Sequence, residues 1–144
     1  MLVSDLMERS PVSIAPEDSC RDAARLLSRC GVGALPVVNA DGELKGILTD
    51  RDVVLRCLAL GKDPDRTPVR DCMTRQVLTV SPNDRVETAA ERMARGQVRR
   101  LPASEGGRLA GMVSLGDLSR VAAFRMEAAR ALAEITRGVR RLSE

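Results

Sequence analysis

Hydrophobic and polar positions in the first part of the chain change from one period to another. Val12-Ser13-Ile14 alternates like a short strand and is followed at once by Pro16. The next segment carries apolar side chains at helical spacing, with Asp18 or Ser19 available as N-cap and Gly31 beyond its end. We therefore expect a strand followed by a helix.

Two short apolar runs, Leu35–Val38 and Leu44–Thr49, come after that helix. Between them, Asn39-Ala40-Asp41-Gly42 has the composition of a hairpin turn. A second helix is predicted to begin at Asp50 or Asp52. The order of elements is therefore strand, helix, strand, strand, helix.

The same pattern returns in the second half of the chain. Gly31–Pro36 aligns with Gln97–Pro102, 66 residues later, and Gly46–Asp52 aligns with Gly111–Asp117, 65 residues later. Matched segments in one order indicate an internal repeat. The second copy is expected to place its elements at residues 77–80, 84–94, 101–103, 109–113 and from 115 onward.

Each repeat offers a small sheet with one apolar face and two helices, which is marginal for independent stability. We expect the two copies to pack by pseudo-twofold symmetry into one α/β body with two related clefts. Prolines and charges mark a linker between them. The predicted divisions are repeat 1 (1–60), linker (61–68), repeat 2 (69–120) and a C-terminal helical extension (121–144).

The last part of the chain, from Leu118, is predicted to form one continuous helix that is longer than the repeat requires. Its apolar side chains fall on a seven-residue register, interrupted by Arg125 and weakened by Gly138, at Val121, Ala128, Leu132, Ile135, Val139 and Leu142. Three alternatives follow: the helix packs on its own module, on a dimer partner, or on another macromolecule. Nucleic acid is the least favoured, since the chain has a single aromatic side chain and lacks a helix-turn-helix pattern.

The composition removes several classes of function. The chain has no His, Trp or Tyr and a single Phe, which excludes His-based catalytic triads and His-bearing metal sites. Without a phosphate-binding Walker loop or an evidently activated cysteine, nothing supports an enzyme. A planar ligand would be gripped by aliphatic side chains and backbone.

The remaining composition indicates an ordinary cytoplasmic protein. The four cysteines lie 10, 27 and 15 residues apart, unlike a zinc ribbon, and we expect them to be reduced thiols. The sequence has no apolar stretch of membrane length, and we do not expect a signal peptide, because Met1-Leu2-Val3 runs directly into Ser4-Asp5. The net charge of +3 neither demands nor excludes a polyanion.

Two segments share one motif: glycine, two hydrophobic residues, Thr or Ser, two residues, then Asp. They are Gly46–Asp52 and Gly111–Asp117, and Asp5-Leu6-Met7 and Asp71-Cys72-Met73 open the two repeats. With the Leu-Pro strands between, residues 1 to about 120 resemble a tandem CBS (cystathionine-β-synthase-type) pair, or Bateman module. The chain also resembles short bacterial two-CBS proteins, including the hypoxic-response group. The resemblance implies two βαββα repeats, to which the C-terminal helix is added.

The resemblance implies where a nucleotide would bind. In this family the hydroxyl and the Asp of the motif face the ribose of an adenosine ligand, which points to Ser114 with Asp117 and to Thr49 with Asp52. A carboxylate at a helix start can accept from both ribose hydroxyls, and the helix N-terminus favours phosphate. The alternative is that each Asp serves only as a helix cap.

The two repeats differ in the cations that they offer to phosphate. Arg99 and Arg100 occupy the positions where the first repeat has Gly33 and Ala34, and nucleotide-binding relatives often carry basic residues there. Two guanidiniums beside the second motif could clamp phosphate, whereas the first motif has only Arg51. The alternative is a solvated arginine pair.

The first strand of the opposite repeat completes such clefts in the family. This implies that Val12 lies near the Asp117 site and Val77 near the Asp52 site. The alternative is that both valines are only core-strand residues.

The sequence therefore predicts a regulatory module that senses an adenosine-type nucleotide (AMP, ADP, ATP or related) in the cleft between two CBS repeats. The nucleotide is a ligand rather than a cofactor, and catalytic residues and metal sites are not expected. We expect a cytoplasmic homodimer that acts on an unidentified effector protein and binds neither membrane nor nucleic acid. The alternative is a structural or protein-interaction adaptor whose clefts bind nothing.

Overall fold

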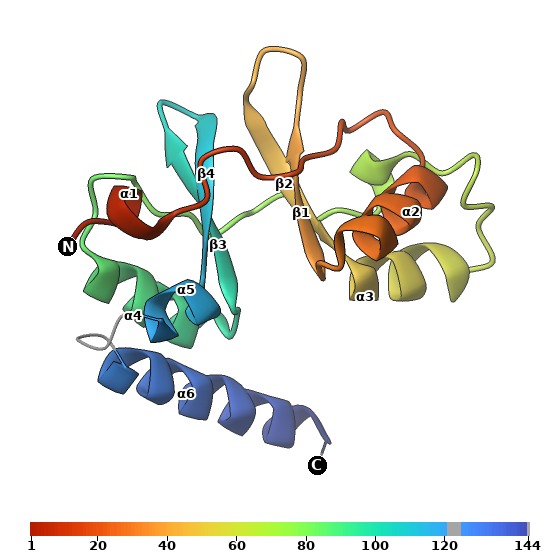
Figure 1. The fold of residues 1–144 in the computed structure, drawn as a ribbon. Helices are drawn as coiled ribbons and strands as arrows, with labels where there is room; N and C mark the ends of the chain where they lie inside the picture. Colours follow the sequence, from red (N-terminus) through yellow and green to blue (C-terminus); the bar gives the residue numbers. More distant parts are fainter. Residues whose placement is uncertain (121–124, 144) are drawn as a thin grey trace. The chain divides into compact units, whose positions relative to one another are not determined.

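The computed structural model describes residues 1–120 and 125–143 and divides into two compact units (Figure 1). Unit 1 contains residues 1–10, 78–106 and the chain from Ala110 onward, whereas unit 2 contains Pro11–Val77 with Gly107–Leu109. The first ten residues thus belong to the unit that contains the helices of the second repeat.

Unit 2 contains one two-stranded sheet and the helices of the first repeat. Its elements are α2 (Cys20–Cys30), β1 (Ala34–Val38), β2 (Leu44–Thr49), α3 (Asp50–Val53), the π-helical turn η1 (Val54–Leu58) and the 3-10 turn η2 (Val69–Asp71). The strands pair antiparallel, with Leu35 opposite Leu48. Ser19 is the N-cap of α2, because its hydroxyl accepts a hydrogen bond from the Asp22 amide at 3.1 Å.

Unit 1 repeats this arrangement and adds a helix at each end. Its elements are α1 (Val3–Leu6), α4 (Val86–Gly96), β3 (Arg100–Glu105), β4 (Arg108–Ser114), α5 (Leu115–Ser119) and α6 (Arg125–Ser143), and β3 pairs with β4 in the second sheet. Val3 is fully buried among the side chains of this unit, and its amide donates to the Asp84 carbonyl at 2.8 Å. These contacts place residues 1–10 in unit 1.

The first strand of each repeat is reduced to one bridge. Ile14 pairs in parallel with Val37, and Val80 pairs in parallel with Ala103, both as isolated bridges. The strands predicted at 12–14 and 77–80 are therefore wrong in extent. Pro16 and Pro82 follow two residues after each bridge, and proline has no amide hydrogen to extend a ladder.

The continuous helix predicted from Leu118 is wrong. Helix α5 ends at Ser119, whose hydroxyl donates to the Gly116 carbonyl at 2.8 Å, and α6 begins at Arg125. A glycine within α5 and a serine that bonds back to the preceding turn both disfavour a long helix. Val121 of the predicted register lies outside the described residues, as do the side chains of Val139 and Leu142.

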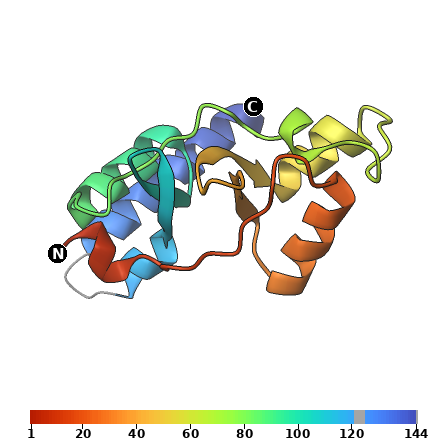
Figure 2. The ribbon, with the colours of Figure 1, turned by 90° about the horizontal axis from the view of Figure 1, so that it is seen from above.

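Helix α6 packs on α4 and α5 of its own unit (Figures 1 and 2). Ala128, Ala131 and Ile135 are buried in the core of unit 1, whereas Leu132 of the predicted register is 41% exposed. Of the three alternatives for this helix, packing on its own module is the one that the structure shows. Along the described ranges, no helix combines the length and apolar character needed to cross a membrane.

Candidate functional site

The motif of the second repeat forms a capping box at the start of α5. The Ser114 hydroxyl accepts from the Asp117 amide at 3.0 Å, and Asp117 Oδ2 accepts from the Ser114 amide at 2.9 Å. The two side chains that the sequence assigned to a ribose are therefore adjacent and fixed by reciprocal hydrogen bonds.

The motif of the first repeat has the same geometry. The Thr49 hydroxyl accepts from the Asp52 amide at 3.0 Å, and Asp52 Oδ2 accepts from the Thr49 amide at 3.0 Å. Helix capping, the simpler role considered for both aspartates, is thus present in both repeats. Each cap uses one carboxylate oxygen and leaves the other oxygen, Oδ1, outside the cap.

The remaining oxygens face different arginines. Asp117 Oδ1 lies 3.5 Å from Arg120 Nη1, and Arg120 is 79% exposed, while Asp52 Oδ1 lies 3.8 Å from Arg56 Nε. Arg56 also donates to two backbone carbonyls at 3.2 Å, which hold it in place. Sequence reasoning missed both arginines, although their spacing of three and four residues from the aspartates is that of helical ion pairs.

The backbone of Arg99 lies beside the second motif. Its carbonyl accepts from the amide of Leu115, the first residue of α5, at 2.8 Å. Arg99 and Arg100 are both exposed, and within the described residues no hydrogen bond or ion pair engages either guanidinium. The structure therefore brings the Arg99 backbone next to Ser114 and leaves two cationic side chains available.

The corresponding loop of the first repeat makes the same backbone contact without the charge. The Gly33 carbonyl accepts from the Asp50 amide at 3.0 Å. Arg51 is exposed on α3, beside Asp52 in the chain. The first repeat thus has Arg51 beside Asp52 but no arginine in the loop before β1, whereas in the second repeat Arg99 precedes β3 and Arg100 begins it.

The two valines expected to border the ligand belong to unit 2. Val12 is 41% exposed, and Val77 is half-buried in the unit that also contains Asp52. Asp117 belongs to unit 1. The juxtaposition of Val12 with Asp117, and that of Val77 with Asp52, stay predictions.

The glycine of each motif allows another segment to approach the strand closely. A Cβ at Gly46 would lie 2.6 Å from the Thr74 carbonyl oxygen, and one at Gly111 would lie 2.6 Å from that of Glu8. Backbone bridges form beside both glycines. The close packing of these segments therefore explains the glycine of each motif.

Three of the four cysteines form a buried cluster in unit 2. Cys20, Cys57 and Cys72 are fully buried, and the Sγ atoms of Cys20 and Cys72 lie 3.5 Å apart. Burial raises the pKa of both Cys20 and Cys72, which keeps these thiols protonated and poorly reactive. All four cysteines are free thiols, and Cys30 is exposed.

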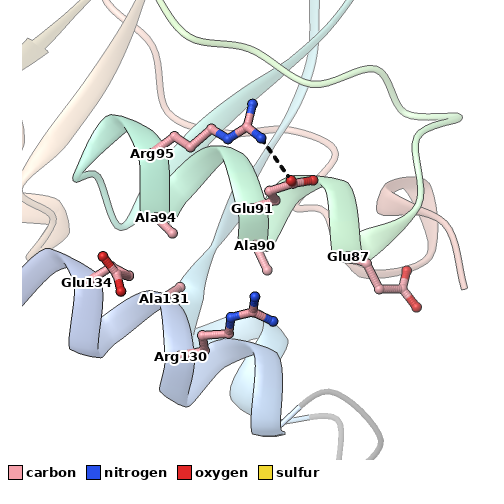
Figure 3. Close-up of a pocket in the computed structure, with 8 residues that line it drawn as sticks. All are labelled: Glu87, Ala90, Glu91, Ala94, Arg95, Arg130, Ala131 and Glu134. Atoms are coloured by element: carbon pink, nitrogen blue, oxygen red, sulfur yellow. Dashed lines mark hydrogen bonds and ion pairs between the residues drawn. The ribbon is translucent and has the colours of Figure 1, made fainter.

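A groove between α4 and α6 is lined by small and charged residues, none of which was predicted as a site residue (Figure 3). Ala90 and Ala131 are buried at the contact of the two helices, and Arg95 forms an ion pair with Glu91 at 3.1 Å. The groove contains charges of both signs, which is typical of a seam between packed helices. Among residues 1–120 and 125–143, no group of three or more His, Cys, Asp or Glu is arranged to hold a metal ion.

Comparison with known proteins defines the class of this chain. The family model of the CBS domain matches twice, at residues 3–58 and 69–123. The chain therefore belongs to the CBS-domain family and contains a tandem pair of these domains. This confirms the resemblance inferred from the repeated motif and the α/β fold expected from it.

Individual relatives place the chain among small two-CBS proteins. It is 42% identical over 117 residues to the CBS domain-containing protein YhcV of Bacillus subtilis, which covers 81% of this chain and 82% of YhcV. It is 31% identical over 116 residues to hypoxic response protein 1 of Mycobacterium tuberculosis, with 81% of each chain covered.

Solved structures of similar proteins share the fold. The structure of Hypoxic Response Protein I with two coordinated zinc ions matches with a TM-score of 0.78 and 30% identity, covering 83% of this chain and 98% of that one. The CBS domain pair of protein MJ0100, in complex with 5-methylthioadenosine and S-adenosyl-L-methionine, matches with a TM-score of 0.74 and 29% identity, over 83% and 98%. A structural relative therefore binds adenosyl ligands.

Proposed function

We propose that this CBS pair is a non-catalytic regulatory module that senses an adenosine-type nucleotide such as AMP, ADP or ATP. In the stronger site, Asp117 and Ser114 hold the ribose and Arg99 and Arg100 hold phosphate. A weaker site uses Asp52, Thr49 and Arg51. Val12 and Val77 contact the bases, as the resemblance implies.

The observation that carries the proposal is the arrangement around Ser114 in unit 1. The capping box leaves one carboxylate oxygen of Asp117 outside the cap. The Arg99 carbonyl accepts a hydrogen bond from the amide of Leu115, the residue after Ser114. The hydrogen bond at the Arg99 carbonyl therefore holds the backbone of the arginine pair beside the capping box. Asp117 Oδ1, the oxygen outside the cap, can accept hydrogen bonds from the ribose hydroxyls. Charge-assisted hydrogen bonds from two arginines favour a phosphate-bearing ligand over a neutral one. The adenosyl complex of the MJ0100 pair supports the same ligand class.

The test is a thermal-shift series with AMP, ADP, ATP and S-adenosylmethionine, and with GMP as the non-adenosine control. A ligand that binds only the folded state at a hundredfold excess over its Kd adds about 2.7 kcal/mol of stability, which is several degrees in Tm for a chain of this size. Unfolding is followed by circular dichroism, because the chain has no Trp or Tyr. If none of the four adenosine ligands shifts Tm at millimolar concentration, the adaptor function replaces this proposal.

The proposal includes a homodimer that relays the bound state to an effector protein. Its support is the apolar surface of unit 2, where Val54, Leu55 and Leu58 are 45–53% exposed on one helical segment. Exposed apolar side chains that cluster in this way are typical of interaction surfaces. Light scattering coupled to size exclusion measures the oligomeric state, and a monomer at all concentrations would remove this part of the proposal.

A further inference from the structure

Gln97 adopts a backbone conformation that its residue type disfavours. It ends α4 in the left-handed region, with φ 56°, and it is the one non-glycine residue with positive φ among those that the structure describes. The first repeat uses Gly31 at the corresponding position, with φ 65°. Because glycine adopts this conformation without a steric penalty, Gln97 carries a local conformational cost that Gly31 does not.

Gly138 is also disfavoured by its own surroundings. It lies inside α6, where alanine would stabilise the helix better. A Cβ placed on Gly138 would overlap Gln97 Oε1 and would lie 2.7 Å from Gln97 Cδ. The Gln97 side chain is anchored there, since its Nε2 donates to the Ala94 carbonyl at 2.7 Å. The two locally unfavourable residues therefore contact each other. This contact explains both the glutamine at a position of positive φ and the glycine within a helix.

The contact lies directly before the arginine pair. Two residues after Gln97 comes Arg99, whose carbonyl is bonded to Leu115 of α5, and α6 packs on both α4 and α5. Helix α6 thus contacts Gln97, which lies just before the arginines proposed to bind phosphate. It also contacts α5, which carries Asp117, the residue proposed to bind ribose.

We propose that Gln97 and Gly138 couple α6 to the nucleotide site of unit 1, so that docking of α6 raises the affinity for AMP and ATP. The inference rests on the proposed function for its ligand. When α6 is docked, the segment before Arg99 is already ordered. Nucleotide binding then does not have to offset the entropic cost of ordering that segment. By reciprocity, a bound nucleotide must stabilise the docking of α6 by the same factor. Gln97 acts as a positioning residue in this scheme.

Two substitutions break the contact from opposite sides without unfolding the chain. Gln97→Asn keeps a residue that tolerates the left-handed conformation but shortens the side chain by one methylene. Gly138→Ala improves the helix but displaces the Gln97 amide. Thr136→Ala is the matched control, because it raises the helix propensity of α6 at an exposed position.

The experiment combines hydrogen exchange with titration calorimetry against AMP and ATP. In the protein without nucleotide, Gln97→Asn and Gly138→Ala should speed amide exchange in α6 and at residues 98–100, whereas Thr136→Ala should not. In calorimetry the same two variants should lose about fivefold or more in affinity, the lower end of typical coupling factors. In the wild type, ATP should slow exchange in α6.

The outcomes separate this inference from the function on which it rests. Unchanged exchange in both variants without nucleotide would overturn the contact, whatever the ligand. If the two variants show altered exchange but the wild type binds neither AMP nor ATP, the proposed function is removed, and the coupling with it, while the contact stands. Binding at wild-type affinity by both variants would overturn the coupling alone.

Discussion

Replacing Asp117 with Asn tests the ribose contact, because it removes the negative charge while keeping a side-chain oxygen for the cap. In the structure Asp117 Oδ2 accepts from the Ser114 amide at 2.9 Å, and an Asn oxygen can take that place. The ion pair lost with Arg120 is a surface pair, since that arginine is 79% exposed, and is worth about 0–1 kcal/mol. The expected loss of folding stability is therefore small.

The loss of affinity should be much larger. A hydrogen bond to a charged group is worth about 1.5–3 kcal/mol, which is roughly a 10- to 140-fold increase in Kd at 1.4 kcal/mol per factor of ten. The matched control is Asp52→Asn, whose capping box has the same geometry, with both hydrogen bonds at 3.0 Å. The two variants should therefore lose similar stability and differ in affinity.

The assay is titration calorimetry with AMP, accompanied by thermal unfolding of each variant. We expect Asp117→Asn to weaken the tighter binding event and Asp52→Asn to leave it nearly unchanged. An equal loss in the two variants, or a larger loss at Asp52, would refute the ranking of the two sites.

Three further outcomes are expected. Replacing both Arg99 and Arg100 with Ala should weaken the binding of AMP and ATP but leave the binding of adenosine unchanged, and high salt should reproduce part of this loss. The measurement is calorimetry with all three ligands, and an equal loss of affinity for adenosine and AMP would contradict the phosphate role. Native protein should react at one thiol, Cys30, with Ellman's reagent and at four thiols in guanidinium chloride, because the other three are buried and inaccessible, and burial also raises the pKa of Cys20 and Cys72. Rapid reaction of more than one native thiol would oppose this. Leu58→Asp should shift the light-scattering mass from dimer to monomer while leaving the circular dichroism spectrum unchanged, and an unchanged dimer would exclude this surface as the interface.

The parts of the fold that local sequence determines could be predicted. Helix caps and the turns between strands depend on a few neighbouring residues, and the capping boxes before α3 and α5 recur at matching positions of the two repeats. Ser19, Thr49 and Ser114 cap the helices that follow them, and Gly42 adopts a positive φ of 83° in the first hairpin. The pairing of Thr49 with Asp52, and of Ser114 with Asp117, follows from the same local rule.

Other features depend on residues far apart in the chain, which sequence periodicity does not reveal. The burial of Val3 in unit 1 requires Asp84 and its neighbours as partners. The seven-residue register of α6 predicted one apolar seam, but the helix buries Ala131 and exposes Leu132, because the surface beneath it is formed by α4 and α5. The position of Gln97 against Gly138 was unpredictable for the same reason.

The assignment of residues 1–10 to unit 1 determines the order in which the chain can fold. Unit 2 forms almost wholly from one continuous stretch, Pro11–Val77, so most of its native contacts join residues that are available before the second repeat is synthesised. Val3 must instead wait for Asp84, 81 residues later, and closing a flexible loop of that length costs about 4 kcal/mol of entropy by the logarithmic rule. Residues 1–10 therefore precede the whole of unit 2 in the chain but find their native partners only after it, when the second repeat has emerged.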